Sequence, residues 1–400
     1  MKRLANLIGG EWLPPQDGQY FDDHNPATGA KIAEIPSSTA DDIEAAVAAA
    51  RAAQPAWGAL LPGERADWLE RIADALEARS AEIAELESRD TGKPVALARA
   101  VDAARSVLNF RFFAELGREL PDEQYLMEDA LNVVVHKPVG VAGLITPWNL
   151  PLYLLSWKVA PAILMGNTVV AKPSRLTPLT ANLLAEIVTE AGLPAGVVNL
   201  VHGSGSVCGS ALVEHPAVGA VSFTGGTATG RRVAAGAAPL FKKLSLELGG
   251  KNATIVCADA DLEKTILGAA RAAFMNQGQV CLCGSRLLIE RSIWDEFVPR
   301  FVVEVRCGDL REECTEVGDA AVTFATVAVP YHLWGATAHS VGADGWTADR
   351  HFHPMFDTKH QTLVSATFSA ECPPPGPLAI LLNGTALMEP VRLPLTTGLH

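Results

Sequence analysis

The chain has 400 residues, of which 48% are hydrophobic, 19% are charged and 34 are glycines. This length is enough for two or three domains, and the composition is typical of an α/β protein rather than a disordered or fibrous one. The formal net charge of −13 argues against a nucleic-acid partner. Binding to a duplex draws its affinity from lysines and arginines, and no basic cluster offsets the acidic balance.

The N-terminal sequence and the cysteine content predict the cellular compartment of the protein. The sequence MKRLANLIGGEWLPP has no apolar run of signal-peptide length, since two glycines and a glutamate interrupt it. Seven irregularly spaced cysteines indicate reduced thiols rather than a disulfide framework. The apolar stretch at 139–171 is broken by prolines and polar residues into pieces too short to span a bilayer. We therefore expect a cytoplasmic protein without a membrane partner.

The pattern from Ser38 to about Arg118 is helical and stops near Gly92 and Pro94. Short β-rich runs then follow, ending in polar or glycine loops: VGVAGLITP, GNTVVAKPS, GVVNLVHG and AVGAVSFTGG. Helical stretches such as PLTANLLAEIVTEAG separate these runs. Strands that alternate with helices predict parallel βαβ units in an open sheet, and such sheets bind small ligands at the carboxyl ends of their strands.

The last part of the chain, residues 319–400, has a different composition. It contains six of the ten histidines and eight prolines. We find no helical period there, and runs such as CPPPGPLAILLNG follow neither a helical nor a strand period. We expect this segment to be irregular or poorly ordered.

Two segments could take part in ligand binding or proton transfer. SFTGGTATGRR, at 222–232, ends an apolar run in two glycines before a helix, where a dinucleotide phosphate could bind; the alternative is a turn that needs glycine for steric reasons. KKLSLELGGKN places Glu247 between leucines. A desolvated carboxylate there would suit a general base, whereas an outward-facing strand residue is the simpler interpretation.

The run GQVCLCGSR contains Cys281 and Cys283. A cysteine becomes a nucleophile when its thiolate is stabilised, and Cys281 follows a glycine-containing turn. Buried free cysteines are also common as small packing residues. A CxC pair without a second pair or a histidine cluster fits a zinc site poorly, so we expect no metal.

Five short motifs occur in order along the chain: PWNLP with Asn149, AKPS with Lys172, SFTGG with Gly225, LELGGK with Glu247 and GQVC with Cys281. Together they resemble the aldehyde dehydrogenase superfamily over about residues 8–318. Segments such as NLPLYLLSWKVAPA and NQGQVCLC are most similar to the 2-aminomuconate and 2-hydroxymuconate semialdehyde dehydrogenase branch. The resemblance implies a Rossmann-type parallel cofactor-binding sheet and an incomplete α/β catalytic domain.

The resemblance implies three catalytic residues for the oxidation of an aldehyde to its acid. Cys281 matches the nucleophile that forms a thiohemiacetal. Asn149, with the Cys281 backbone N–H, matches the group that holds the oxyanion. After hydride transfer to the nicotinamide leaves a thioester, Glu247 matches the base that activates water. Cys283 has no role in this scheme, and we expect it to be a packing residue.

The resemblance also implies a cofactor site, with Lys172 at the adenosine ribose and Gly225 under the pyrophosphate. Arg175 stands where the family usually has an acidic residue that binds the ribose hydroxyls, so we expect a weakened preference for NAD and some tolerance of NADP. Gly226 stands where the family commonly has a serine near the cofactor phosphates. The expected cofactor-binding residues are Thr146, Pro147, Trp148, Lys172, Ser174, Arg175, Gly225, Gly226 and Leu248.

A branch that acts on the semialdehydes of dicarboxylic acids also needs a cation for the carboxylate at the far end of the substrate. AARSVLNFRFF offers Arg105 first and Arg111 second; the alternative for both is an ordinary helix-surface charge. Asn149 would also contact the substrate. The family further implies a homo-oligomer.

The sequence departs from the family pattern after about Gly318. The segment whose glutamate holds the nicotinamide ribose is absent from 319–400, as is the strand used in subunit pairing. Our hypothesis is a change of reading frame or an alternative terminal exon, and the alternative function is an inactive variant. The expected domains are a cofactor-binding domain at 1–119 and 139–247, bridging strands at 120–138, a partial catalytic domain at 248–318 and the atypical tail at 319–400.

Overall fold

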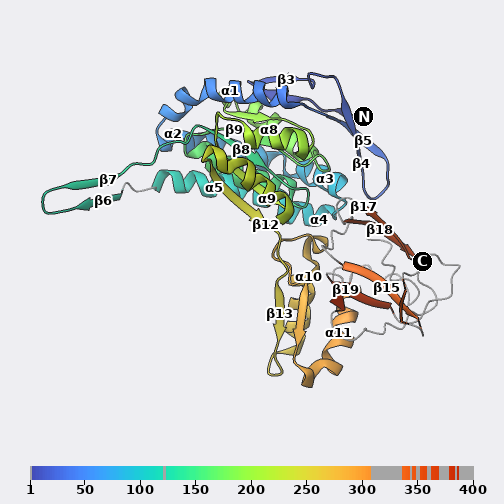
Figure 1. Cartoon of the computed structure of the whole chain (residues 1–400). Helices are drawn as coiled ribbons and strands as arrows, with labels where there is room; N and C mark the ends of the chain where they lie inside the picture. The colour runs from blue at the N-terminus through green and yellow to red at the C-terminus, as the bar shows by residue number, and fades with distance from the viewer. Residues whose placement is uncertain are drawn as a thin grey trace. The chain divides into compact units, whose positions relative to one another are not determined.

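The computed structural model describes residues 2–119 and 123–307, together with the backbone of six strands between residues 336 and 386 (Figure 1). The chain divides into two compact units, Met1–Leu248 and Gly249–His400. Each unit is described by itself.

The first unit is built on a seven-stranded sheet (Figure 1). Five strands are parallel, while β2 and β3 add an antiparallel edge. In spatial order the strands are β12 (Lys243–Leu248), β11 (Val218–Gly225), β8 (Val141–Ile145), β9 (Thr168–Lys172), β10 (Val198–Leu200), β2 (Asn6–Ile8) and β3 (Glu11–Leu13). The predicted α/β class with a parallel sheet is confirmed.

Both faces of this sheet are covered by helices, which explains why its central strands are nearly continuous apolar runs. On one face Val141 and Ile145 of β8 pack with α1 (Ala40–Ala59), α8 (Ser210–Glu214) and α9 (Thr227–Ala237). On the other face Ala142 and Leu144 pack with α6 and α7. These two helices, Pro151–Leu164 and Leu179–Glu190, are in turn covered by α2 (Pro62–Ala78) and α5 (Ala104–Glu119).

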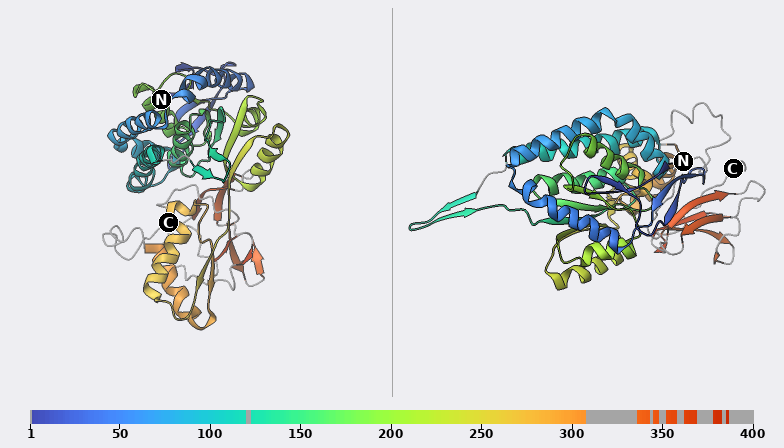
Figure 2. Two further views of the ribbon diagram at one scale, coloured as in Figure 1. Left: turned by 90° about the vertical axis from the view of Figure 1, so that its left-hand side faces the viewer. Right: turned by 90° about the horizontal axis from the view of Figure 1, so that it is seen from above.

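Two smaller β-structures belong to the same unit. One is a three-stranded sheet of β1 (Lys2–Arg3), β5 (Lys31–Pro36) and β4 (Tyr20–His24). The other is a hairpin of β6 (Glu123–Leu126) and β7 (Leu131–Val134), all of whose residues are exposed. Figure 2 shows the hairpin extending away from the sheet and helices of its unit.

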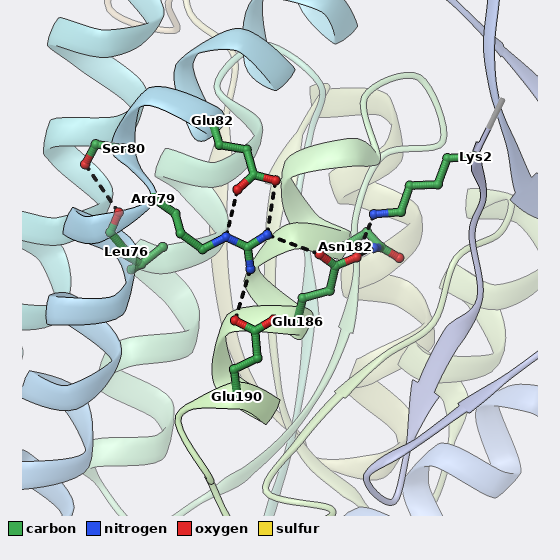
Figure 3. A network of polar contacts seen from close by, with 8 residues as sticks. All are labelled: Lys2, Leu76, Arg79, Ser80, Glu82, Asn182, Glu186 and Glu190. Carbon is green, nitrogen blue, oxygen red and sulfur yellow. Dashed lines mark hydrogen bonds and ion pairs between the residues drawn. The ribbon is translucent and has the colours of Figure 1, made fainter.

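Ion pairs at the surface join three segments of the first unit (Figure 3). Arg79, between α2 and α3 (Ser80–Thr91), pairs with Glu82 at 2.8 Å and with Glu190 of α7 at 3.2 Å. Glu186 of α7 accepts from Lys2 at 2.6 Å and also lies 3.5 Å from Arg79. Exposed pairs of this kind contribute about 0–1 kcal/mol each, so the network orients these segments more than it stabilises them.

The second unit begins with a βαβ motif. Strands β13 (Ala253–Val256) and β14 (Arg286–Ile289) pair in parallel and are connected through α10 (Leu262–Phe274). The helix α11 (Trp294–Cys307) follows, and its Phe297 is buried with Val256, Ile266 and Ala269. This small core agrees with the predicted α/β catalytic portion.

The tail differs from the expected irregular segment in having strands. β15 (Ala336–Gly342) pairs with β16 (Gly345–Thr347) and β19 (Leu378–Leu382), and β19 pairs with β20 (Thr385–Ala386). β17 (Phe352–Asp357) pairs with β18 (Thr362–Phe368). All pairings are antiparallel, and runs such as TLVSATF have the β-branched content that strands favour. The rest of 319–400 lies outside the described residues.

No helix in the described ranges is both long and apolar enough to cross a membrane.

Four carboxyl side chains are buried in the part of the first unit where the three-stranded sheet and α3 contribute residues. Glu87, Asp90 and Asp102 are at most 2% exposed, and Asp23 of β4 is 3% exposed. Glu87 accepts from the Thr180 hydroxyl at 2.5 Å, and Asp90 accepts from the Leu179 N–H at 2.8 Å. Burial raises the pKa of Asp23 to about 7 and that of Glu87 to about 8, and it also raises the pKa of Asp90 and Asp102.

These raised pKa values predict that stability falls as the pH rises. Between pH 4.5 and about 8 the folded chain retains a proton on Glu87 that the unfolded chain has lost, so the free energy of unfolding decreases across that window. We expect Glu87→Gln to flatten this decrease, because glutamine does not titrate. Urea unfolding of the full chain at a series of pH values measures the effect. The exposed Glu85→Gln on the same helix is the control, and an equal slope in both variants would contradict the prediction.

Candidate active site

The expected cofactor residues of the first unit gather at one edge of the main sheet. Thr146 follows β8, Lys172 ends β9, Gly225 ends β11 and Leu248 ends β12. These four strands are adjacent and parallel, in the order β12, β11, β8, β9. Their carboxyl ends therefore lie side by side, where ligands bind in open α/β sheets.

Lys172 is buried at this edge without a carboxylate partner among the described residues. Its Nζ donates to the carbonyl oxygens of Pro173 at 2.8 Å and Gly203 at 3.1 Å, and burial lowers its pKa to about 8. The neighbouring Thr146 hydroxyl is buried with no hydrogen-bond partner in the described part of the chain. Buried polar groups are normally satisfied, so an ammonium held only by carbonyls beside an unpaired hydroxyl fits a site for a polar ligand.

Ser174 and Arg175 follow directly in the loop after β9. The Ser174 hydroxyl accepts from the Leu176 N–H at 3.2 Å and so shapes the turn. Arg175 is exposed, and its guanidinium lies 5.4 Å from the centre of the Phe21 ring. An exposed guanidinium at this edge can bind an anion.

The turn from β11 to α9 is closely packed around its glycines. Gly226 occupies the N-cap of α9, and no side chain caps the helix there, so its first amides can receive an anion. A Cβ on Gly225 would lie 2.5 Å from the Phe223 ring. A Cβ on Gly230, one turn into α9, would lie 2.5 Å from Leu248. The glycines thus have a steric function, and the open helix end is compatible with phosphate binding.

The candidate catalytic residues of the first unit lie at the same edge. Pro147, Trp148 and Asn149 are half-buried in the segment between β8 and α6. Glu247 is the penultimate residue of the edge strand β12, opposite Thr224 of β11, and its side chain is exposed within this unit. Within the first unit, the placement of Glu247 therefore fits the outward-facing interpretation.

Lys158 is a residue that the sequence analysis missed. It lies on α6 and is 7% exposed, and its Nζ donates to the Ser222 hydroxyl of β11 at 2.7 Å. Burial lowers its pKa to about 8, while the Glu247 carboxylate favours its charged form. Its signal in the sequence was a single lysine inside the apolar run YLLSWKVAPA, where a charge needs a partner.

The two cysteines of the second unit differ in their surroundings. Cys281 is exposed, whereas Cys283 is 6% exposed and burial raises its pKa. A raised pKa reduces the thiolate fraction, so Cys283 is the poorer nucleophile of the two. The exposure of Cys281 is compatible with the role that the motif predicts for it, and that role stays a prediction.

The loop that leads to Cys281 has unusual backbone angles. Asn276, Gln277 and Gly278 have φ values of 51°, 65° and 69°. Non-glycine residues in this region cost about 1–2 kcal/mol each, and such strain is concentrated at functional sites. The side chains of Asn276 and Gln277 are buried, which fixes the strained loop. Cys281 belongs to the second unit.

The two arginines considered for the substrate carboxylate have different partners. Arg111 forms ion pairs with Glu70, Asp74 and Glu77 of α2. Arg105 is exposed, lies 5.6 Å from the centre of the Tyr153 ring and has no carboxylate partner in the described residues. Arg105 is thus the better candidate for an anionic ligand.

Comparison with known proteins gives the family. Residues 12–325 match the family described as "Aldehyde dehydrogenase family". The chain belongs to this family. Its match spans the five parallel strands of the main sheet, the strand ends with the candidate cofactor residues and the loop of Cys281.

Its relatives include semialdehyde dehydrogenases. It is 50% identical over 305 residues to the 2-aminomuconic semialdehyde dehydrogenase of Mus musculus, covering 76% of this chain and 62% of that protein. It is 48% identical to the 2-hydroxymuconic semialdehyde dehydrogenase of Pseudomonas sp. (strain CF600), covering 75% and 63%. The chain therefore spans about three fifths of the length of these relatives.

Solved structures agree with the fold. PnpE from Pseudomonas sp. WBC-3 superposes with a TM-score of 0.73 at 43% identity, covering 75% of this chain and 62% of PnpE. A structure of PnpE in complex with nicotinamide adenine dinucleotide superposes equally well, with a TM-score of 0.73. The described residues contain no group of three histidine, cysteine, aspartate or glutamate side chains that could hold a metal ion.

The different burial of the cysteines predicts selective alkylation. At neutral pH iodoacetamide should modify the exposed Cys281, while Cys283 should react at least about tenfold more slowly because its thiol is buried and its pKa is raised. Time-resolved peptide mass spectrometry measures both rates in one sample. The exposed Cys257 and the buried Cys208 are internal controls. Equal rates at Cys281 and Cys283 would contradict the prediction.

Proposed function

We propose that this chain is an NAD(P)-dependent aldehyde dehydrogenase that oxidises a muconate-type semialdehyde to its carboxylic acid. The observation that carries the proposal is the array of candidate residues at the carboxyl ends of four adjacent parallel strands, in a chain that matches the family over residues 12–325. The names of the relatives support the substrate class.

The residues present fit a nicotinamide dinucleotide. Lys172 and the unpaired Thr146 hydroxyl would bind the adenosine ribose, and the α9 amides after Gly226 would bind the pyrophosphate. The remaining contacts would come from Pro147, Trp148, Ser174, Arg175, Gly225 and Leu248. The nicotinamide supplies the hydride acceptor.

The chain's own residues would perform the acyl chemistry. The Cys281 sulfur adds to the aldehyde carbon, and the new oxyanion is held by the Asn149 side-chain amide and the Cys281 N–H. Loss of hydride from that carbon leaves a thioester on Cys281. Glu247 then accepts a proton from water as the water attacks the thioester, which releases the acid and the Cys281 thiolate.

Lys158 would assist Glu247 in this last step. Its ammonium donates to the Ser222 hydroxyl, and the Glu247 carboxylate favours its charged form, so the two side chains would attract one another at the edge where Glu247 acts. Because burial lowers the pKa of Lys158 to about 8, this attraction would decrease above that pH.

Arg105 would bind the carboxylate at the far end of the substrate from the aldehyde. Its guanidinium is exposed and in contact with the Tyr153 ring at the start of α6, and Asn149 lies just before this helix. A guanidinium can bind a carboxylate with two parallel hydrogen bonds.

We also propose that the chain acts as a homo-oligomer and that the expected domain ranges are functional divisions. The exposed hairpin β6–β7 presents Tyr125, Leu126, Leu131 and Val133 to solvent. Apolar side chains on a projecting hairpin are typical of a surface that is covered in an assembly.

A non-catalytic chain is the alternative function. The family match ends at residue 325, and the chain covers 62% of the length of the mouse relative. A chain of this kind would bind the cofactor weakly or act only through other subunits. A thiol esterase that uses Cys281 without hydride transfer is a second alternative, and its ester hydrolysis would not change when the cofactor is omitted.

The proposal predicts distinct kinetics for three variants of the full chain. Cys281→Ala should abolish NADH formation from a semialdehyde, whereas Cys283→Ala should retain it. Glu247→Gln should form about one NADH per active site and then turn over at least about 100-fold more slowly, because the thioester persists without its base. Stopped-flow absorbance and mass spectrometry of the Cys281 peptide measure these outcomes. Absence of both burst and adduct in the unmodified chain would favour the non-catalytic alternative.

Arg175 gives a prediction about cofactor choice. A guanidinium favours a 2′-phosphate, whereas a carboxylate accepts hydrogen bonds from the ribose hydroxyls. We expect Arg175→Glu to raise the ratio of kcat/KM for NAD to that for NADP by about tenfold or more. Arg79→Glu, a charge reversal remote from the cofactor edge, is the control. An unchanged ratio in Arg175→Glu would show that this residue does not contact the ribose.

A further inference from the structure

A buried lysine donates a hydrogen bond to the backbone of the segment that carries Asn149. The Nζ of Lys93 donates to the backbone carbonyl oxygen of Asn149 at 3.3 Å, although the two residues are 56 positions apart. Lys93 is 1% exposed and lies just after α3. Its ammonium therefore contacts the candidate oxyanion residue at its main-chain carbonyl.

The second partner of this lysine is Asp102. The Asp102 carboxylate lies 2.9 Å from the Lys93 Nζ, and both side chains are fully buried. Asp102 belongs to η1 (Arg99–Ala103), a turn of π-helix between α4 (Val95–Ala98) and α5. Such turns are rare, are retained mostly at functional sites, and here carry an acidic residue into the interior.

The other carboxyls of the buried group limit the negative charge around this pair. The Asp102 charge raises the pKa of Glu87, and the Asp23 charge raises that of Asp90. Burial raises the pKa of all four groups, which favours their protonated forms, while the Lys93 charge acts in the opposite direction on Asp102 and Glu87. Among the four carboxyls, Asp102 is the one that forms an ion pair with Lys93, at 2.9 Å.

A further contact restrains the helix that follows Asn149. The Asn109 amide of α5 donates to the Tyr153 carbonyl at 3.2 Å and to the Ser156 hydroxyl at 2.9 Å. The backbone from 149 to 156 is therefore held at two places by donors from the α3–α5 side. Of these contacts, the hydrogen bond from Lys93 is the one made to the Asn149 peptide itself.

We propose that Lys93, anchored by Asp102, is a positioning residue that fixes the Asn149 backbone and with it the direction of the Asn149 side-chain amide. The inference rests on the proposed function in so far as Asn149 holds an oxyanion. An oxyanion donor must be fixed before the reaction to be effective, and a misplacement of about 1 Å can reduce the rate about 100-fold.

The first test is amide hydrogen exchange of the full chain, which needs no activity. Lys93→Met should raise the exchange rate of peptides covering 148–154 by at least tenfold. Lys242→Met is the matched control, because Lys242 also donates to two backbone carbonyls of the same unit, those of His215 and Val218. Lys93→Arg should restore much of the protection.

A double variant keeps the test valid if Lys93→Met does not fold. Lys93→Met leaves the Asp102 charge buried and unpaired, which destabilises strongly. The double variant Lys93→Met with Asp102→Leu removes both charges and should fold with the same increase in exchange at 148–154. If neither variant raises exchange there beyond the Lys242→Met control, the inference is overturned.

The second test separates this inference from the proposed function. Where the unmodified chain gives an NADH burst, the Lys93 variants should lower the burst rate at least tenfold, with KM for the cofactor within about twofold of the unmodified chain. A purely structural residue would lower the amount of active protein and not the rate per active site. Where the unmodified chain gives no burst, the proposed function fails, and the exchange result still decides whether Lys93 positions Asn149.

Discussion

Parallel pairing of β9, β8, β11 and β12 is the constraint on which the site of the first unit depends. In-register parallel pairing places the four carboxyl ends at one edge, so that residues separated by up to about a hundred positions in the chain meet there. The pairing is stable because both faces of the sheet are buried by helices on opposite sides. As a result, polar side chains at the carboxyl ends of these strands, such as Lys172 and Thr146, are buried.

Much of the fold could be predicted from the sequence because its determinants are local. The β-rich runs ending at Ile145, Lys172 and Gly225 have the length and composition of buried strands, and the helical runs between them require parallel connections. The strand order could not be obtained in this way. Whether β12 or β10 is the edge strand of the sheet depends on contacts between distant segments. The spacing of hydrophobic residues along the sequence contains no information on such contacts.

The candidate site was predictable residue by residue where a short motif carries it, as for Cys281 and Asn149. The surroundings of these residues were not. Lys158 and Lys93 are isolated lysines in the sequence, and their importance comes from burial beside Ser222 and Asp102. The π-helical turn that brings Asp102 inward has no local sequence signal, and the exposure of Glu247 follows from its edge strand.

The hairpin β6–β7 has a consequence for how the stability of this protein depends on its concentration. A two-stranded hairpin with all residues exposed is at best marginally stable in water by itself. If the proposed homo-oligomer covers Leu126 and Leu131, the covering surface is supplied by mass action. Dilution would therefore affect the hairpin before it affects the doubly covered sheet.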